Sequence, residues 1–91
     1  MARLLLTQGA EIIVRAKEAS GFFSLDEMQA YCEGDIQIEG LNDGTYLVCN
    51  ENGIAEGLSY NAAATVWVHT RGLPGNPVVG NALIATEDEI E

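Results

Sequence analysis

The alternation of polar and apolar residues is clearest in the middle of the chain, between residues 35 and 50. Residues 35–39 (DIQIE) alternate strictly, as the two faces of a half-buried β-strand do. Residues 45–50 (TYLVCN) are apolar on both faces, which is typical of a central strand covered on two sides. Asp43-Gly44 lies between them and favours a tight reversal. The pattern predicts an antiparallel hairpin over residues 35–50.

The N-terminal segment carries two more apolar runs, at residues 2–7 (ARLLLT) and 11–15 (EIIVR). We predict a strand for each run, joined by a turn at Gln8-Gly9. The apolar residues at even positions of both strands fit a buried face. The opposite face, which carries Leu5 and Ile13, is open to burial as well.

A short helix is predicted between these two hairpins, over residues 25–33. Ser24 and Glu27 form the sequence signature of a capping box, in which each side chain accepts from the other residue's backbone N–H. Gly34 follows at the position where helices commonly end. The helix is short, so its stability must come from packing on the sheet.

A second helix is predicted over residues 62–69, with Asn61 as its N-cap. The alanines of this segment favour a helix, whereas its TVWV run favours a strand. We choose the helix because Asn61 is a good cap and because Ala63, Val66 and Trp67 fall on one helical face.

The C-terminal part begins with a predicted loop at residues 70–77, which contains two prolines and two glycines. Residues 78–86 are predicted to form a bent closing strand that is interrupted at Gly80-Asn81. Residues 87–91 are an acidic tail, which we expect to fray. The resulting prediction is a single α+β domain over residues 1–86. It consists of a small mixed, mainly antiparallel sheet of about five strands with one or two short helices packed on it.

The charge and the hydropathy of the chain exclude some classes of binding partner. Fourteen acidic residues outnumber four basic ones, Arg3, Arg15, Lys17 and Arg71, and the formal net charge is −10. Such a surface repels phosphates, so direct nucleic-acid binding is not expected. Three interpretations of the acidity stay open: solubility, a proteome biased toward acidic proteins, and mimicry of nucleic acid toward a DNA-binding protein. No apolar run approaches a membrane span or a signal-peptide core, so we expect no membrane association and an intracellular protein.

Few residues have catalytic or metal-binding chemistry. His69 is the sole histidine, and Cys32 and Cys49 are the two cysteines. A zinc site usually needs four nitrogen or sulfur ligands, more than these residues supply, so we interpret the cysteines as reduced core residues. We predict no catalytic residue, no metal site and no cofactor, and enzymatic activity is the hypothesis with least support.

A set of polar and aromatic residues at the predicted element ends is the best candidate for a ligand site. The simpler interpretation is that its asparagines and glutamate only satisfy turns and caps. The alternative is a pocket for a small polar ligand such as a nucleotide signal, with Trp67 or Tyr60 stacked on a base and Arg71 on a phosphate. The candidate residues are Asn50, Glu51, Tyr60, Asn61, Trp67, Arg71 and Asn81.

Three segments carry a resemblance to a known family: GDIQIEGLNDGTYLVCNENGIAEGL, SYNAAATVW and NPVVGNALIAT, which together run from Gly34 to Thr86. They resemble the DUF3846 family of small domains of unknown function, encoded largely by bacteriophages and mobile elements. The matching residues are mostly turn and cap residues, such as Asn50-Glu51-Asn52-Gly53 and Val79-Gly80-Asn81. The resemblance implies a small accessory protein in the cytoplasm of a bacterial host.

Two functional hypotheses follow. The first is a non-enzymatic accessory protein that binds a host protein, such as a defence or nucleic-acid-binding protein, and inhibits a defence system. The second is an oligomeric protein that binds or sequesters a small nucleotide-type ligand. An unprotected edge strand, at residues 2–7 or 82–86, offers a surface on which two copies can pair into a homodimer.

Overall fold

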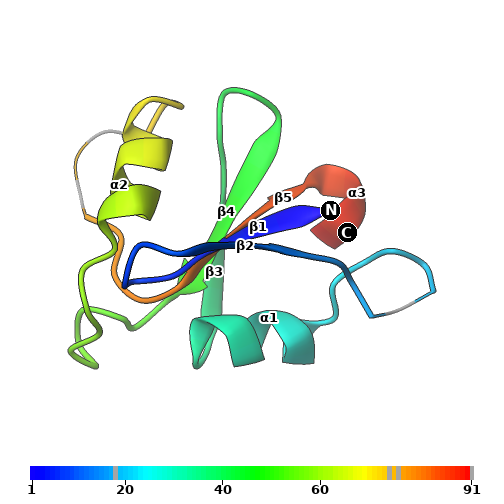
Figure 1. The fold of residues 1–91 in the computed structure, drawn as a ribbon, viewed down its shortest axis with the longest axis horizontal. Coiled ribbons are helices and arrows are strands. Elements are labelled where there is room, and N and C mark those ends of the chain that lie inside the picture. The colour runs from blue at the N-terminus through cyan, green and yellow to red at the C-terminus, as the bar shows by residue number, and fades with distance from the viewer. Residues whose placement is uncertain (18, 74, 76, 91) are drawn as a thin grey trace.

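The computed structural model describes residues 1–17, 19–73, 75 and 77–90. Five antiparallel strands form one sheet in the order β2-β1-β5-β4-β3, with helices packed on it (Figure 1). The predicted α+β fold and the predicted hairpin are therefore confirmed. The elements are β1 (Ala2–Leu5), β2 (Glu11–Val14), α1 (Leu25–Cys32), β3 (Ile36–Gly40), β4 (Thr45–Asn50), α2 (Ala62–His69), β5 (Ala82–Thr86) and α3 (Glu87–Ile90).

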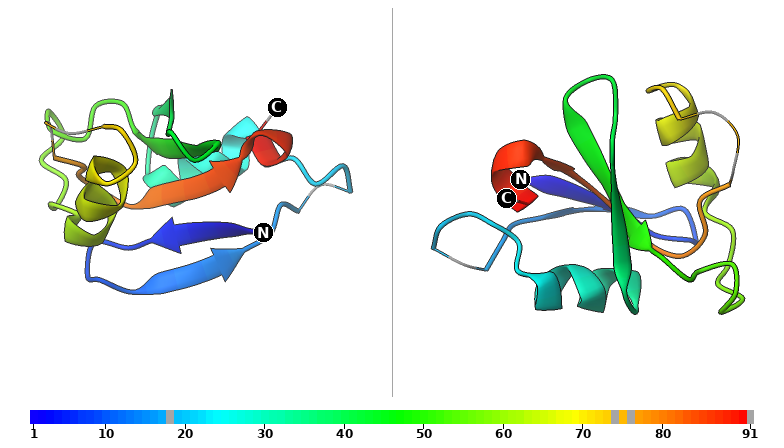
Figure 2. Two further views of the ribbon diagram at one scale, coloured as in Figure 1. Left: turned by 90° about the horizontal axis from the view of Figure 1, so that it is seen from above. Right: turned by 180° about the vertical axis from the view of Figure 1, so that it is seen from behind.

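The last strand, β5, lies at the centre of the sheet, between β1 and β4. The expectation that residues 2–7 or 82–86 provide a free edge is therefore wrong. The first four residues of β5 are all buried, as in a strand covered on both faces and paired on both sides. The two outer strands are β2 and β3, at opposite edges of the sheet (Figure 2).

Two hydrophobic cores lie on the two faces of the sheet. Successive strand residues point to opposite faces, so β4 contributes Leu47 and Cys49 to the core beneath α2 and Val48 to the core beneath α1. The prediction of a central strand covered on two sides is confirmed. Neither helix spans the whole sheet, and both edge strands stay largely exposed.

The edge strands depart from the predicted burial. Ile12 and Ile13 of β2 are 45% and 52% exposed, and Ile38 of β3 is 44% exposed. The strands themselves are predicted correctly. Of the expected buried face of β2, Val14 is half-buried against the core, whereas Ile12 is exposed. The buried residues of α1 and α2 belong to the two cores, and those cores are built on the inner strands.

Helix α1 begins as predicted. The Ser24 Oγ accepts from the Glu27 N–H at 3.1 Å, and Glu27 Oε1 accepts from the Ser24 N–H at 3.2 Å, so the capping box is complete. The buried Phe23 and Met28 flank the cap in the positions of a hydrophobic staple. The helix ends one residue earlier than predicted, because Glu33 rather than Gly34 adopts the left-handed C-cap conformation (φ 66°).

Helix α2 also forms with its predicted cap and bounds. Its buried side chains are Ala64, Thr65 and Val68, so the buried face of the helix is not the face that Ala63, Val66 and Trp67 share. Val66 is exposed, and Trp67 packs at the border of the core. Thr65 is buried because its hydroxyl has partners: it donates to the Asn61 carbonyl at 2.8 Å and accepts from the Val78 N–H at 2.9 Å.

The C-terminal end is folded. The predicted interruption before β5 is confirmed, with an isolated bridge between Tyr60 and Val79 preceding the strand. Residues 87–90 form α3 rather than a frayed tail, and Glu91 lies outside the described residues. Glu89 Oε1 accepts from the Thr86 N–H at 2.9 Å, and this side chain is buried. The T-x-x-E signature of this turn is present in the sequence and could have predicted it.

Candidate functional site

Asn61 is fully buried and holds three segments together. Its Oδ1 accepts from the Ala64 N–H at 3.0 Å, which caps α2. Its Nδ2 donates to the carbonyl oxygens of Leu5 and Gly80, both at 2.9 Å. The side chain therefore joins the end of β1, the start of α2 and the turn before β5. All of its polar atoms have partners within the protein.

Asn50 plays a comparable part at the C-terminal end of β4, at the same end of the sheet. Its Nδ2 lies 3.2 Å from the Cys32 carbonyl oxygen and 3.2 Å from Glu56 Oε1, and its Oδ1 accepts from the Asn52 N–H at 2.7 Å. The amide thus satisfies the C-terminal end of α1 and the turn that follows β4. A Cβ at Gly34 would lie 2.9 Å from this Nδ2, so glycine at this position gives the amide room.

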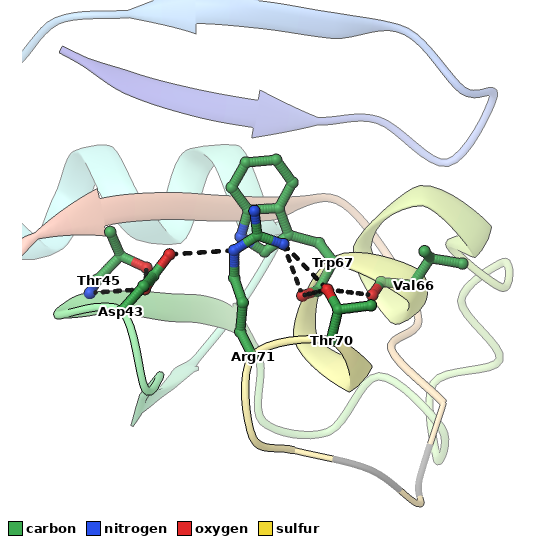
Figure 3. A network of polar contacts seen from close by, with 6 residues as sticks. All are labelled: Asp43, Thr45, Val66, Trp67, Thr70 and Arg71. Carbon is green, nitrogen blue, oxygen red and sulfur yellow. Dashed lines mark hydrogen bonds and ion pairs between the residues drawn. The ribbon is translucent and has the colours of Figure 1, made fainter.

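The other residues of the predicted set do not gather at one site. Asn81 is half-buried, and its Oδ1 accepts from the Thr7 N–H at 3.2 Å. Tyr60 and Glu51 are exposed, Tyr60 beside its bridge to Val79 and Glu51 in the turn after β4. Trp67 and Arg71 are brought together, but with Asp43 and not with the asparagines (Figure 3).

The stack of Arg71 on Trp67 closes the end of α2. The guanidinium carbon lies 3.8 Å from the centre of the indole ring, a favourable cation–π geometry. Arg71 Nη1 also donates to the Trp67 carbonyl oxygen at 3.1 Å, which satisfies a carbonyl of the last helical turn. Arg71 Nε forms an ion pair with Asp43 Oδ2 at 3.0 Å, so the loop between β3 and β4 is tied to the helix. Figure 3 shows these contacts together.

Asp43 is stabilised in its charged form. Thr45 donates to Asp43 Oδ1 from its hydroxyl at 2.5 Å and from its N–H at 3.1 Å. These two bonds, with a further contribution from Arg71, hold the pKa of Asp43 below its ordinary value. The hydrogen bonds to the Asp43 carboxylate therefore stabilise the predicted turn at Asp43-Gly44.

Arg3 is the second cation on the same indole. Its guanidinium carbon lies 5.3 Å from the Trp67 ring centre, and it also pairs with Glu11 of β2. The indole Nε1 is buried and has no acceptor within the described part of the chain. Trp67 is thus flanked by two of the four basic residues.

A groove of about 610 Å³ opens on the α2 side of the sheet, between the β3–β4 hairpin and the segment before β5. Its floor is apolar, and its rim combines exposed acidic and amide side chains with the exposed apolar residues Ile54, Ala55 and Pro77. Asn50 and Glu51 are the two predicted site residues that border it, and no lysine or arginine lines it among the described residues. The floor consists of Leu47, Cys49, Val68 and Val78, and the polar part of the rim of Gln37, Glu39, Glu51 and Asn52.

The rim residues Gln37 and Glu39 were not among the predicted site residues. They pair with Cys49 and Leu47 in the sheet and therefore share their face. The polar positions of the DIQIE alternation are the sequence signal that marks them. At the far side of the groove, a Cβ on Gly53 would lie 2.6 Å from Val79 Cγ2, so the close approach of these two segments requires glycine.

The two thiols are buried and poorly suited to nucleophilic chemistry. Burial, with the nearby Cys49 and Glu33, raises the pKa of Cys32 to about 12. Burial, with the nearby Glu39, raises the pKa of Cys49 to about 11. Both thiols are therefore protonated at neutral pH. Among the described residues, no three histidine, cysteine or acidic side chains gather as a metal site would require.

Comparisons with known proteins bear on the family alone. No helix in the described part of the chain combines the length and apolar character needed to cross a membrane. Comparison with curated proteins and with solved structures gave no match. The family model described as "Domain of unknown function (DUF3846)" matches residues 1–91. The match spans the whole chain, so this protein belongs to the DUF3846 family.

Proposed function

We propose that the protein is a non-enzymatic accessory protein that acts by binding a host protein in the bacterial cytoplasm, and that the groove receives a basic side chain of this partner. The observation that supports the proposal is the composition of the groove. Its floor is apolar, its rim carries Glu39 and Glu51, and no basic residue lines it among the described residues.

Lysine and arginine side chains match this composition better than a nucleotide does. Each has an apolar stem that can cover Leu47 and Val78 and a cationic head that can reach the acidic rim. A nucleotide would bring phosphates to carboxylates with no arginine or lysine to receive them. The groove therefore favours a protein partner with a basic surface. Nucleic-acid-binding proteins carry surfaces of this kind.

The distribution of basic residues also favours a cationic partner at the groove. Three of the four basic residues, Arg3, Arg15 and Lys17, lie in or directly after β1 and β2, at the edge opposite β3. The acidic residues that line the groove are Glu39 and Glu51. A field of this kind speeds the approach of a cationic partner and weakens with added salt. Inhibition of a defence component by occupation of its basic surface is the functional outcome that we propose.

Titration of the ¹⁵N-labelled protein with defined ligands tests the proposal. We expect a short arginine- or lysine-containing peptide to shift the amide signals of Gln37, Glu39 and Asn52, and a matched glutamate peptide to leave them unchanged. The double variant Glu39→Gln with Glu51→Gln removes this response. Asp88→Asn makes the same kind of charge change on α3, away from the groove, and keeps it.

The contrary results are equally specific. If the basic peptides produce no shift in the wild-type protein, the groove does not receive such a side chain and the proposal fails. If nucleotides shift the signals of Trp67 and Arg71 instead, the alternative of a nucleotide-binding protein takes its place. A nucleotide panel therefore belongs in the same series, at the same ionic strength.

A further inference from the structure

The free edge of β2 has the properties of a self-complementary pairing surface. The strand occupies one edge of the sheet, and among the described residues no strand lies beyond it (Figure 2). It exposes Ile12 on one face and Ile13 on the other, each by about half. An exposed edge with apolar side chains on both faces invites a further strand.

The backbone of β2 determines which residues can receive that strand. The Leu6 N–H donates to the Ala10 carbonyl at 2.9 Å, and antiparallel pairs alternate between hydrogen-bonded and non-hydrogen-bonded positions. Continuing the observed register, even-numbered residues of β2 direct their backbone groups toward β1. Glu11 and Ile13, and then Arg15 directly after the strand, direct theirs outward. These three positions are the ones that a new strand can bond.

We propose that a second copy of this chain pairs with β2 in an antiparallel arrangement, with Ile13 opposite Ile13 of the partner copy on the two-fold axis. In this register Glu11 lies opposite Arg15 of the partner copy, and Arg15 opposite its Glu11. Each of these pairs joins outward-facing backbone groups, so each exchanges both backbone hydrogen bonds. The two sheets then continue into one.

Charge complementarity identifies the second copy as the occupant. A shift of two residues one way places Glu11 opposite Ile13, and a shift the other way places Ile13 opposite Arg15. The proposed register alone matches isoleucine with isoleucine and acid with base, which cross-strand pairs favour. Glu11 already pairs with Arg3 of its own chain, so the interface extends an existing ionic contact. The chain beyond Arg15 turns away, since the Lys17 N–H is bonded to Glu27 of α1.

The apolar side chains are covered in the same arrangement. Ile13 packs on Ile13 of the partner copy on the α2 side of the sheet. On the other side, Ile12 lies opposite Val14 of the partner copy. The basic residues gathered at this edge also make it the least acidic side of a protein with a net charge of −10, so like-charge repulsion between copies is lowest here.

Sedimentation equilibrium and cysteine cross-linking test the proposal. We expect the wild-type protein to show a monomer–dimer equilibrium at micromolar to millimolar concentration. Ile13→Lys abolishes the dimer, because a charged residue at the centre of an edge strand blocks pairing. Ile38→Lys, at a similarly exposed position on the other edge strand, keeps it. Circular dichroism shows that both variants are folded.

Cross-linking tests the register. In Ile13→Cys the two new thiols face each other across a hydrogen-bonded pair, at a Cα separation of about 5.5 Å that a disulfide can span. In Ile12→Cys they are diagonal and do not link. The native cysteines are buried and do not interfere. A protein that stays monomeric, a dimer that survives Ile13→Lys, or a link formed by Ile12→Cys in place of Ile13→Cys overturns the proposal.

Discussion

Replacement of Asn61 tests how the three segments around it are held. In Asn61→Ala the helix loses its N-cap, which costs about 1 kcal/mol. The carbonyl oxygens of Leu5 and Gly80 lose a donor in a buried setting, at about 1 kcal/mol or more each. The sum is a loss of about 3 kcal/mol, a large part of the 5–15 kcal/mol by which domains are typically stable.

The variant Asn61→Asp separates the two contributions. Aspartate is as good an N-cap as asparagine, so a role limited to capping predicts almost unchanged stability. The structure predicts a loss of at least about 2 kcal/mol, because the donor is gone and a carboxylate oxygen faces two carbonyl oxygens. The matched control is Asn52→Asp, where the asparagine is exposed.

Urea unfolding, followed by circular dichroism and by the fluorescence of the single tryptophan, measures these differences. Each variant should lower the urea midpoint while the dependence on denaturant stays constant. A free energy of unfolding for Asn61→Asp within about 0.5 kcal/mol of the wild type refutes the bridging role.

Three further outcomes are expected. Arg71→Lys keeps the charge but loses the planar stack, so it shifts the tryptophan fluorescence and destabilises the protein by about 1 kcal/mol; an unchanged spectrum contradicts the stack. Asp43 has a lowered pKa, so its contribution to stability is complete above its unfolded pKa and is lost as pH falls through the folded value. Thr45→Val removes the hydroxyl donor and raises the carboxyl titration midpoint measured by carbon-13 NMR, and an unmoved midpoint contradicts this cause. Cys32 and Cys49 are protonated and buried, so a thiol reagent labels them in urea but not in the native protein at pH 8; rapid native labelling contradicts their burial.

The sequence predicted well those features whose causes lie within a few residues. The capping box of α1 joins Ser24 to Glu27, and the N-cap of α2 joins Asn61 to Ala64. Both involve side chains whose partner lies three residues away, and local chemistry determines them. The T-x-x-E turn at Thr86 is also a local feature, because the partner of Thr86 is Glu89, three residues away. The sequence could therefore have predicted it.

The strand order depended on contacts that no local pattern encodes. An apolar segment such as ALIAT fits any position that is covered on both faces. Its place between β1 and β4 follows from pairing with residues near both the start and the middle of the chain. Ile13 and Ile38 are exposed for the same reason. The sequence pattern identifies an apolar face of a strand, but it does not say whether a helix covers that face.

The candidate site shows a similar division. An asparagine that binds a ligand and one that bridges two backbone segments have the same amide chemistry. What distinguishes Asn61 is its bond to Leu5, 56 residues away in the chain. The sequence placed Trp67 and Arg71 in one candidate site without a contact between them; in the structure they stack on each other, and the acid that receives Arg71 is Asp43, 28 residues away. Such distant partners are visible only in the folded protein.

The two proposals concern opposite edges of one sheet, and this separation makes them testable independently. A dimer through β2 would place the two grooves beside β3 and its counterpart, at the far ends of a continuous sheet. Each groove would still bind a short basic peptide with unchanged affinity, since β2 contributes no residue to it. A partner with two basic sites would gain from simultaneous binding. We therefore expect Ile13→Lys to weaken binding of a tethered pair of peptides of sufficient span while leaving the single peptide unaffected. Equal loss for both ligands would show that the edge and the groove are coupled, and would contradict the independence inferred from their positions in the sheet.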